Sequence, residues 1–379
     1  MKLPVFVVFL FIGFSTLQAS GENGKTLQFV HVVMRHGVRT PASTYPNDPY
    51  INNSFYPTGW GQITNEGKMQ LFNVGKYLRE RYGNFLGNHY SPEEYYTQST
   101  GVDRTKVSMQ LVNAGLWPPQ GDQRWGPLDW QPVPITAEKL EEDMLLLVRK
   151  PCPQYHIEKQ RIMKSPEVQN MFKQYETLFK ELTNITGQNT TDFDGVQDIY
   201  STLLAEERSN LTLPEWTKGY YPDKMYYPTV KSFVLNAFND KMNRYIGGVL
   251  LKKLIEDWSA KAAGTIKPSA RKAILYGGHD GTIVNLLSTL KVWDEQFPGY
   301  AITILFELYK DNATSDYGVE IYLRNSTEVP PFKLTIPGCD SFCPLTKLKE
   351  LTKNVIPQNW EEECKTDIKD FVVPELGGP

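Results

Sequence analysis

The residues best suited to chemistry are a histidine and two arginines that lie close together near the start of the chain. Arg35, His36 and Arg39 follow residues 27–34, a short apolar run rich in β-branched side chains, which is typical of a buried strand. The planar guanidinium of arginine suits two-point contact with phosphate oxygens, and an imidazole can act as a nucleophile. We therefore expect His36 to meet a phosphorus atom while the arginines hold its oxygens. A solvated basic loop would use the same residue types, so position must decide between the two interpretations.

A histidine and a carboxyl group follow another short strand far along the sequence. Residues 273–276 are apolar and predict a strand, two glycines come next, and His279 and Asp280 follow directly. Residues 283–290 then continue as a helix, whose N-terminus favours an anion. Because ligands of open α/β sheets bind at the carboxyl ends of strands, both groups of residues should reach the same crevice.

A third strand delivers a further arginine. Residues 95–99 predict a strand, and Arg104 lies in the first turn of the helix that follows. A cation at this end stands against the helix dipole, so its presence indicates that an anion binds nearby. The alternative is that the neighbouring Asp103 simply neutralises Arg104.

Together these segments predict phosphoryl transfer. The set combines two imidazoles, three guanidinium groups and one carboxyl group. It holds too many cations and too few ligands for a metal site, so we expect neither a metal nor another cofactor. The sequence contains neither a Gly-x-Ser-x-Gly motif nor a P-loop. His36 would attack phosphorus and become a phosphohistidine, neutral Asp280 would protonate the departing alkoxide, and water would hydrolyse the intermediate.

The rest of the pattern indicates which elements hold these segments in place. Thr64 is the expected N-cap of a helix that ends at Gly83, and residues 135–258 read mostly as helix. Residues 301–324 contain two alternating apolar runs around a polar turn, which predicts an antiparallel hairpin at a sheet edge. Residues 41–61, rich in Pro, Asn, Tyr and Ser, should form one wall of a pocket over the carboxyl edge of the sheet.

Composition and targeting signals limit where the protein works. The chain of 379 residues has 40 Lys and Arg against 43 Asp and Glu, and this net charge of −3 gives no sign of nucleic-acid binding. Residues 1–20 have a positive start, an apolar core and a small-residue end, the pattern of a secretory signal peptide cleaved after Ala19 or Ser20. The apolar core is short for a membrane span of about twenty residues, and the C-terminus shows no anchor motif. We therefore expect a soluble, secreted protein without a membrane anchor.

Cysteines and glycosylation sequons agree with an oxidising compartment. An even number of cysteines in a secreted chain predicts two disulfides with three alternative pairings, and zinc is disfavoured because no histidine lies near the one close cysteine pair. The cysteines are Cys152, Cys339, Cys343 and Cys364. Six Asn-x-Ser/Thr sequons predict surface glycosylation, at Asn52, Asn184, Asn189, Asn210, Asn312 and Asn325.

Residues 35–41 read Arg-His-Gly-Val-Arg-Thr-Pro, and with the distant His279 and Asp280 they resemble the histidine acid phosphatase family, a branch of the histidine phosphatase superfamily. The resemblance spans nearly all of the mature chain, because further stretches look similar at residues 64–67, 103–105, 213–216 and 338–344. It is strongest toward the secreted and lysosomal acid phosphatases of animals, in particular insect venom or salivary-type members.

The resemblance implies a role for each candidate residue. His36 would be the phosphorylated nucleophile and Asp280 the proton donor. The implied phosphate-binding residues are Arg35, Arg39, Arg104 and His279. The implied disulfides join Cys152 with Cys364 and Cys339 with Cys343. Val38 stands where an aspartate is common in animal members, and phytase-like relatives also carry valine there, so a phytase-like specificity stays open.

The resemblance also implies an architecture and an activity. The expected fold is α/β, with a central mixed, mostly parallel sheet flanked by helices, and a smaller, mainly helical domain inserted in it. The expected boundaries place the α/β domain at residues 21–134 and 259–379 and the inserted domain at 135–258. The implied activity is that of a secreted acid phosphatase acting on small phosphate monoesters, with a lysosomal location and a homodimer both open. A phytase-like enzyme, or a non-catalytic binding protein or allergen that keeps the fold, are the alternatives.

Overall fold

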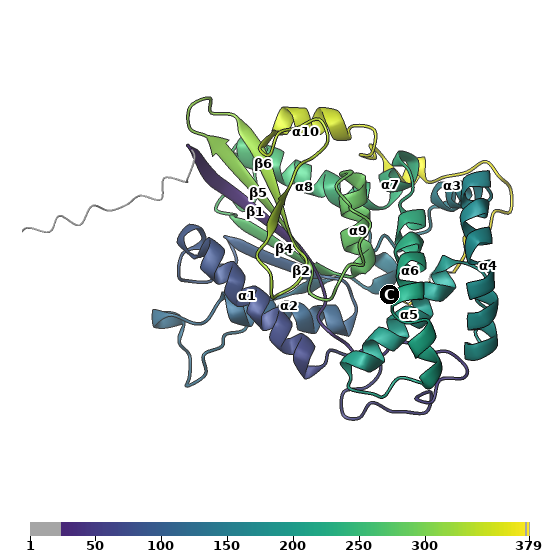
Figure 1. Cartoon of the computed structure of the whole chain (residues 1–379). Helices are drawn as coiled ribbons and strands as arrows, with labels where there is room; N and C mark the ends of the chain where they lie inside the picture. Colours follow the sequence, from purple (N-terminus) through teal and green to yellow (C-terminus); the bar gives the residue numbers. More distant parts are fainter. Residues whose placement is uncertain (1–23, 376, 379) are drawn as a thin grey trace, which may run out of the picture.

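The computed structural model describes residues 24–375, 377 and 378 (Figure 1). The expected signal peptide at residues 1–20 lies outside this range. The described residues form a mixed sheet of eight strands, in the order β3-β2-β4-β1-β5-β6-β7 with β8 paired to β6, and helices cover both of its faces. The strands are β1 Lys25–Arg35, β2 Tyr95–Ser99, β3 Thr136–Ala137, β4 Ala273–Gly278, β5 Thr303–Asp311, β6 Tyr317–Arg324, β7 Phe332–Leu334 and β8 Cys343–Pro344.

The two halves of the sheet differ in strand direction. β1, β4, β2 and β3 are parallel to one another, whereas β5 pairs antiparallel with β1, and β6, β7 and β8 extend that antiparallel half. The predicted mixed sheet is confirmed, but its parallel part is confined to one half. The predicted hairpin of β5 and β6 is also present, although it lies inside the sheet and not at its edge, because β7 and β8 pair with β6 beyond it.

The helices surround this sheet and fill the middle of the chain. They are α1 Asn65–Leu86, α2 Asp103–Leu116, α3 Pro153–Met163, α4 Pro166–Thr186, α5 Phe193–Arg208, α6 Asp223–Asn236, α7 Asp240–Tyr245, α8 Gly247–Ala262, α9 Asp280–Thr289, α10 Leu345–Thr352 and α11 Trp360–Glu363, with short 3₁₀ turns at Gly121–Gln123, Leu140–Glu142 and Glu215–Gly219. No helix within the described residues combines the length and the apolar character needed to span a bilayer.

The first strand is buried on both faces over most of its length, which explains why most of its central residues are apolar. Phe29 and Val33 pack with Trp258 under α8 and α9, whereas Val30 and Val32 pack under α1 and α2 on the opposite face. Successive strand side chains point to opposite faces, so a strand covered from both sides is mostly apolar, and its buried His31 is paired with Asp257 at 3.2 Å. This packing fixes the direction in which β1 delivers the residues that follow it.

Helices α3 to α6 gather beside the sheet instead of on its faces (Figure 1). They pack a core of their own, which includes Val168, Leu182, Phe193, Leu203 and Met225. The mainly helical character predicted for residues 135–258 is therefore confirmed, although α8, which begins in this segment, packs against the sheet. The division of the chain into domains at residues 134 and 258 stays a prediction.

The N-terminus of α1 touches the loop after β1 without room for a side chain between them. Thr64 caps α1 as predicted, since its Oγ1 accepts a hydrogen bond from the amide of Gly67 at 3.2 Å. The helix runs on to Leu86, past the predicted end at Gly83. A Cβ atom added at Gly67 would lie 2.1 Å from the carbonyl oxygen and 2.7 Å from the amide nitrogen of Val38, and backbone atoms cannot yield as a flexible side chain does.

We expect Gly67→Ala to lower the free energy of unfolding by about 1–3 kcal/mol, because overpacking a tight contact forces the backbone apart. Denaturant unfolding of the purified protein measures this change. Gly83→Ala is the matched control in the same helix, since its Cβ would meet only the flexible side chain of Arg79, and alanine is the better helix former. Equal stability of Gly67→Ala and wild type would show that the contact is looser than described.

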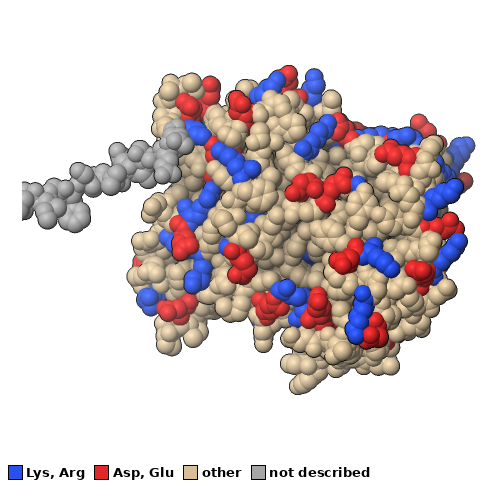
Figure 2. Space-filling model, viewed as in Figure 1, with Lys and Arg blue, Asp and Glu red and all other residues tan. Residues whose placement is uncertain are grey.

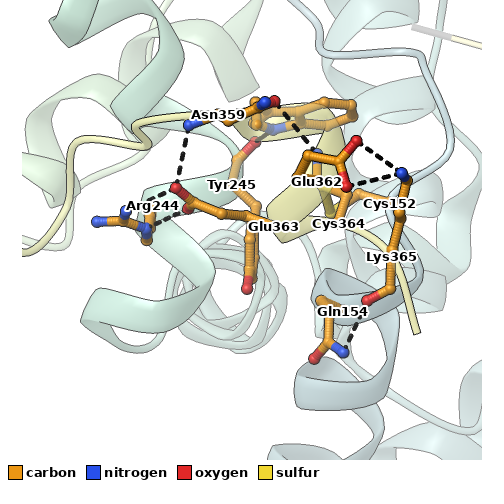
Figure 3. Close-up of a disulfide and its surroundings, with 10 residues drawn as sticks. Cys152, Gln154, Arg244, Tyr245, Asn359, Glu362, Glu363, Cys364 and Lys365 are labelled. Atoms are coloured by element: carbon orange, nitrogen blue, oxygen red, sulfur yellow. Dashed lines mark hydrogen bonds and ion pairs between the residues drawn. A yellow bond between two sulfur atoms is a disulfide. The ribbon is translucent and has the colours of Figure 1, made fainter. Parts of the chain in front are cut away.

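Both disulfides form, with the pairing that the resemblance implied. Cys152 at the start of α3 is bonded to Cys364 at the end of α11, 212 residues away, and Cys339 is bonded to Cys343. Figure 3 shows the first bond among polar contacts that fix the same segment. Among them, Arg244 contacts the carboxyl group of Glu363 with its Nη2 at 2.8 Å. The bond therefore fastens the C-terminal segment to the helical part of the molecule.

Removing the long-range disulfide with Cys152→Ala and Cys364→Ala should cost about 2–5 kcal/mol of stability, because the bond closes a long loop of the unfolded chain. Denaturant unfolding without reductant measures the loss. The control pair Cys339→Ala and Cys343→Ala opens a loop with a sequence separation of 4, so it should cost less. A larger loss for the short loop than for the long one would contradict this account.

Five of the six sequon asparagines are exposed: Asn52, Asn184, Asn189, Asn210 and Asn312. The sixth, Asn325, is half-buried, and its Nδ2 donates a hydrogen bond to Oε1 of Gln296 at 2.8 Å. Nδ2 is the atom to which a glycan would be attached, so the glycosylation prediction suits the five exposed positions better than Asn325.

Candidate active site

The carboxyl ends of three parallel strands bring the predicted residues to one edge of the sheet. In the register of the sheet, Arg35 at the end of β1 lies beside Gly278 of β4, and Ser99 at the end of β2 lies beside Gly277. The backbone amide of His36 continues the pairing, donating to the carbonyl oxygen of Gly278 at 3.1 Å. The segments that begin at Arg35, Thr100 and His279 therefore meet, as the strand-end argument predicted.

One ring nitrogen of His36 is hydrogen-bonded to the backbone, and the other is available for reaction. Its Nδ1 lies 2.9 Å from the carbonyl oxygen of Gly37. A carbonyl oxygen only accepts hydrogen bonds, so Nδ1 carries the proton in the neutral ring and Nε2 keeps its lone pair. A Cβ atom at Gly37 would lie 2.4 Å from Leu71 and 2.6 Å from the carbonyl oxygen of Gly67, so glycine is required where this carbonyl turns toward the ring.

His36 is surrounded by cations that keep it neutral. Burial lowers the pKa of its imidazole well below the ordinary value, and the charges of Arg35 and Arg104 lower it further. The neutral ring, which is the nucleophilic form, therefore persists in acidic solution. The ring of His279 lies close by, with 5.4 Å between the two ring centroids.

The three arginines of the site are buried, with only 1% of Arg35, 9% of Arg39 and 5% of Arg104 exposed. By contrast, positive and negative side chains are interspersed on the surface in Figure 2, without a broad patch of one sign. The alternative of a solvated basic loop is therefore wrong. Buried cations are stable only when an opposite charge compensates them, and Asp280 supplies one such charge through its contact with Arg35.

Arg35 fixes the position of Asp280. Its Nη2 lies 2.9 Å from Oδ2 of Asp280, its Nη1 donates to the carbonyl oxygen of Pro298, and its guanidinium lies 4.5 Å from the centroid of the Tyr300 ring. Burial raises the pKa of the Asp280 carboxyl group, but the charge of Arg35 and a hydrogen bond from the amide of Gly281, among other contacts, outweigh it, so the pKa lies below the usual range.

Arg104 faces the site and is not neutralised by its neighbour in the chain. Asp103 forms an ion pair with Lys106 at 2.7 Å, so the alternative that it serves Arg104 is not supported. Nη2 of Arg104 lies 3.5 Å from Nδ1 of His279, and Nε2 of His279 lies 3.0 Å from Oγ1 of Thr100. Burial, followed by the repulsion of Arg39, lowers the pKa of Arg104 to about 10, so it stays charged.

Residues 26–324 match the family model described as histidine phosphatase superfamily (branch 2). The chain belongs to this superfamily. It is 37% identical to prostatic acid phosphatase of Rattus norvegicus over 356 residues, which cover 92% of both chains. It is 34% identical to human lysosomal acid phosphatase over 94% of this chain and 84% of that one, and 36% identical to a venom acid phosphatase of Apis mellifera over 89% and 87%.

A solved structure supports the same fold at greater distance. The phytase of Hafnia alvei superimposes with a TM-score of 0.67 over 91% of this chain and 100% of its own, at 17% sequence identity. At this identity the match shows the fold alone. The α/β fold that the resemblance implied is thus confirmed for this branch 2 histidine phosphatase.

A cavity of about 400 Å³ opens beside the site of this histidine phosphatase. Arg39 and Asp280 line it on the sheet side, Ser43 belongs to the wall loop (residues 41–61), and His156 and Asp198 line it from α3 and α5. The wall loop therefore forms part of the pocket, as predicted. The helices beside the sheet complete it.

Val38 does not line this cavity, because its side chain is fully buried. Its amide donates to Oε1 of Gln70 at 3.0 Å, and its carbonyl oxygen accepts from the amide of Thr64 at 3.0 Å. Val38 therefore packs inside the protein and fastens the loop after β1 to the N-terminal end of α1.

The sequence prediction missed three residues of the site. Thr100 contacts His279, and it could have been found by the strand-end argument because it directly follows β2. Pro298 and Tyr300, which hold Arg35, lie in the irregular segment before β5. No pattern in that segment indicates contact with a residue so distant in sequence.

Proposed function

We propose that this histidine phosphatase is an acid phosphatase that hydrolyses phosphate monoesters through a phosphohistidine at His36. The observation that carries the proposal is a buried, neutral imidazole with an available Nε2, set among three buried arginines, one of which pairs with the carboxyl group of Asp280. The names of the relatives, all acid phosphatases, support the activity. Their prostatic, lysosomal and venom origins, together with the two disulfides, support a secreted or lysosomal location.

Binding would place the phosphate group among the cations. The oxygens of the ester would accept hydrogen bonds from Arg35, Arg39 and Arg104, and the ring of His279 would lie beside them. The three guanidinium groups attract a phosphate anion, and low local polarity strengthens that attraction. The alcohol part of the ester would extend into the cavity beside Asp280.

In the first chemical step, Nε2 of His36 attacks phosphorus and the bond from phosphorus to the ester oxygen breaks. The hydrogen bond from Nδ1 to the Gly37 carbonyl stabilises the charge that develops on the ring. The arginines stabilise the phosphoryl oxygens as charge moves among them. Asp280 donates a proton to the departing oxygen, so an alcohol leaves and the aspartate becomes a carboxylate.

In the second step, the same carboxylate takes a proton from water, which attacks the phosphohistidine. The bond from Nε2 to phosphorus breaks and inorganic phosphate leaves. His36 is then neutral and Asp280 protonated, as at the beginning of the first step. The protons balance over the cycle, because the one given to the alcohol is recovered from water.

The pKa of Asp280 and the protonation of the substrate together give a reason for activity in acid. Its pKa in the free protein lies below the usual range, so it is ionised before substrate binds. A phosphate monoester has a second pKa of about 6, and below that pH it arrives with a proton. The bound phosphate also offsets the arginine charges that keep the pKa of Asp280 low, so the aspartate can hold this proton. Activity should therefore fall as the pH rises above the second pKa of the substrate.

The assay that tests the proposal is phosphate release by the purified, glycosylated protein from simple alkyl and aryl monoesters across acidic and neutral pH. Turnover that is greatest in mildly acidic buffer is the expected result. No turnover at any pH would overturn the proposal and favour a non-catalytic binding protein.

Phytate in the same assay separates the phytase-like alternative. The relatives that match over most of both chains are acid phosphatases, whereas the phytases match in fold alone, so simple monoesters should be the better substrates. A homodimer stays a prediction, which light scattering of the purified protein can test.

A further inference from the structure

A pair of acidic groups lies between the wall loop and α5, apart from the residues of the proposed chemistry. Glu206 in the last turn of α5 is 0% exposed, and Asp48 in the wall loop is 3% exposed. The carboxyl group of Asp48 lies within hydrogen-bonding reach of Glu206. Two buried carboxyl groups in contact are unusual, because burial penalises the charge of each and the two charges repel.

The surroundings of this pair offer no charge compensation. Neither carboxyl oxygen of Glu206 accepts a hydrogen bond from any donor in the described part of the chain. The oxygens of Asp48 accept from the hydroxyl group of Thr44 and, at 2.8 Å, from the amide of Tyr50. The buried hydroxyl group of Tyr45 lies nearby and also has no hydrogen-bond partner among the described residues.

The other charged groups near this end of α5 are engaged elsewhere. Glu207 accepts a hydrogen bond from the hydroxyl group of Tyr221 at 2.9 Å, and Arg208 pairs with Glu66. Among the described residues, the titratable group that acts on Glu206 is Asp48. A hydrogen bond between two carboxyl groups needs one proton. A single proton therefore removes one of the two buried charges and replaces their repulsion with a hydrogen bond.

The same loop touches the helical part at further points. The hydroxyl group of Thr202 in α5 donates to the carbonyl oxygen of Ser43 at 3.1 Å, and the amide of Asn47 donates to the carbonyl oxygen of Thr186 at 2.9 Å. Ser43 lines the cavity together with Arg39. The contacts of the wall loop with α5 therefore fix the part of the cavity wall that lies next to Arg39.

We propose that Asp48 and Glu206 share one proton and that this hydrogen bond holds the wall loop against α5 in the position that the reaction needs. Glu206 is then a positioning residue, which acts through the loop and touches no substrate. Loss of the shared proton leaves two buried carboxylates in contact, and their repulsion loosens the wall next to Arg39. The shared proton thus favours attachment of the wall loop to α5 in acid.

The direction of the pH effect follows from the proton count. Burial, and then the charge of Asp48, raise the pKa of Glu206 to about 8, whereas glutamate in the unfolded chain titrates near 4.3. Between these values the folded protein holds a proton that the unfolded chain has lost, so stability falls as the pH rises through this window. Below the window Glu206 is protonated in both states, so its titration no longer changes the stability.

The test compares Glu206→Gln, which keeps a hydrogen-bond donor but cannot ionise, with wild type. Melting temperatures are measured from about pH 5 to about pH 8, with Glu207→Gln as the control one position along the helix. The difference between Glu206→Gln and wild type should shift in favour of the variant by about 3 °C or more as the pH rises. The control should follow wild type, and Glu206→Ala should be less stable than wild type in acid.

A difference between Glu206→Gln and wild type that is the same at every pH would overturn the proposal. The melting experiment needs no activity, so its result stands apart from the proposed function. The positioning role does rest on that function, and inorganic phosphate tests it as a competitive inhibitor. The ratio of the inhibition constants of wild type and Glu206→Gln should rise at least about threefold between about pH 5 and about pH 8, because only the wild-type wall loosens. A constant ratio would show that the pair does not position the site.

Discussion

His36→Ala is expected to lower kcat/KM by at least about 10⁴-fold, since loss of the attacking group removes the covalent route altogether. The side chain is buried, and its Nε2 has no other evident task in the free protein. The measurement is steady-state hydrolysis of 4-nitrophenyl phosphate in mildly acidic buffer. A melting curve of the variant must accompany it, because only a folded protein reports on chemistry.

His89→Ala is the matched control for this substitution. The side chain of His89 is 57% exposed and contacts Asp122, and His89 precedes the start of β2, whereas the site lies at the carboxyl ends of the strands. Its activity should equal that of wild type. A folded His36→Ala protein that kept more than about one hundredth of the wild-type kcat/KM would show that another group attacks phosphorus.

The second large effect is expected for Asp280→Asn, and it should depend on the leaving group. An asparagine cannot give a proton to the departing oxygen, so hydrolysis of alkyl phosphates should fall by about 10²–10⁴-fold in kcat. The 4-nitrophenolate ion is a much weaker base and leaves without a proton, so its ester should lose far less. The ratio of the two losses, measured under one set of conditions, distinguishes proton donation from a general loss of structure.

Asp240→Asn provides the control, because Asp240 begins the short helix α7 and pairs with Lys291 on the surface. Both substrates should be hydrolysed by this variant as by wild type. An equal loss on both esters in Asp280→Asn would mean that the aspartate mainly holds Arg35, with which it is in contact at 2.9 Å.

The sequence predicted the site well where strand ends set positions. Three short predicted strands become β1, β2 and β4, and the residue types directly after them are charged or polar. Because parallel strands in register bring such residues to one edge, His36, Arg104 and His279 could be placed together without a structure. The same argument could have found Thr100 and did not, since a threonine carries no charge to draw notice.

Contacts made through irregular backbone could not be predicted in this way. Tyr300 and the carbonyl oxygen of Pro298 hold Arg35, yet they come from a segment without periodicity. The contact of Glu206 with Asp48 likewise joins a helix to a loop, and an acidic residue near a helix end is usually solvated. Such pairs depend on how the helices beside the sheet pack against the wall loop, which local patterns do not encode.

The number of parallel strands in the sheet also could not be predicted from local sequence patterns. Buried strands are apolar on both faces whether their neighbours run parallel or antiparallel, so β5 gives no sign of the direction in which it pairs with β1. The cysteines show a similar limit. Their number predicted two bonds, but the choice of Cys152 with Cys364 came from the resemblance and from the fold.

The central claim is that phosphate passes through His36, and trapping the intermediate tests it most directly. Wild-type protein is mixed with an ester labelled in its phosphate group and quenched in alkali within the first turnover, and the labelled peptide is then identified by mass spectrometry. The account predicts one phosphate on His36, stable in alkali and lost in acid, and none in His36→Ala. Phosphate on another residue, or turnover without any labelled protein, would contradict it.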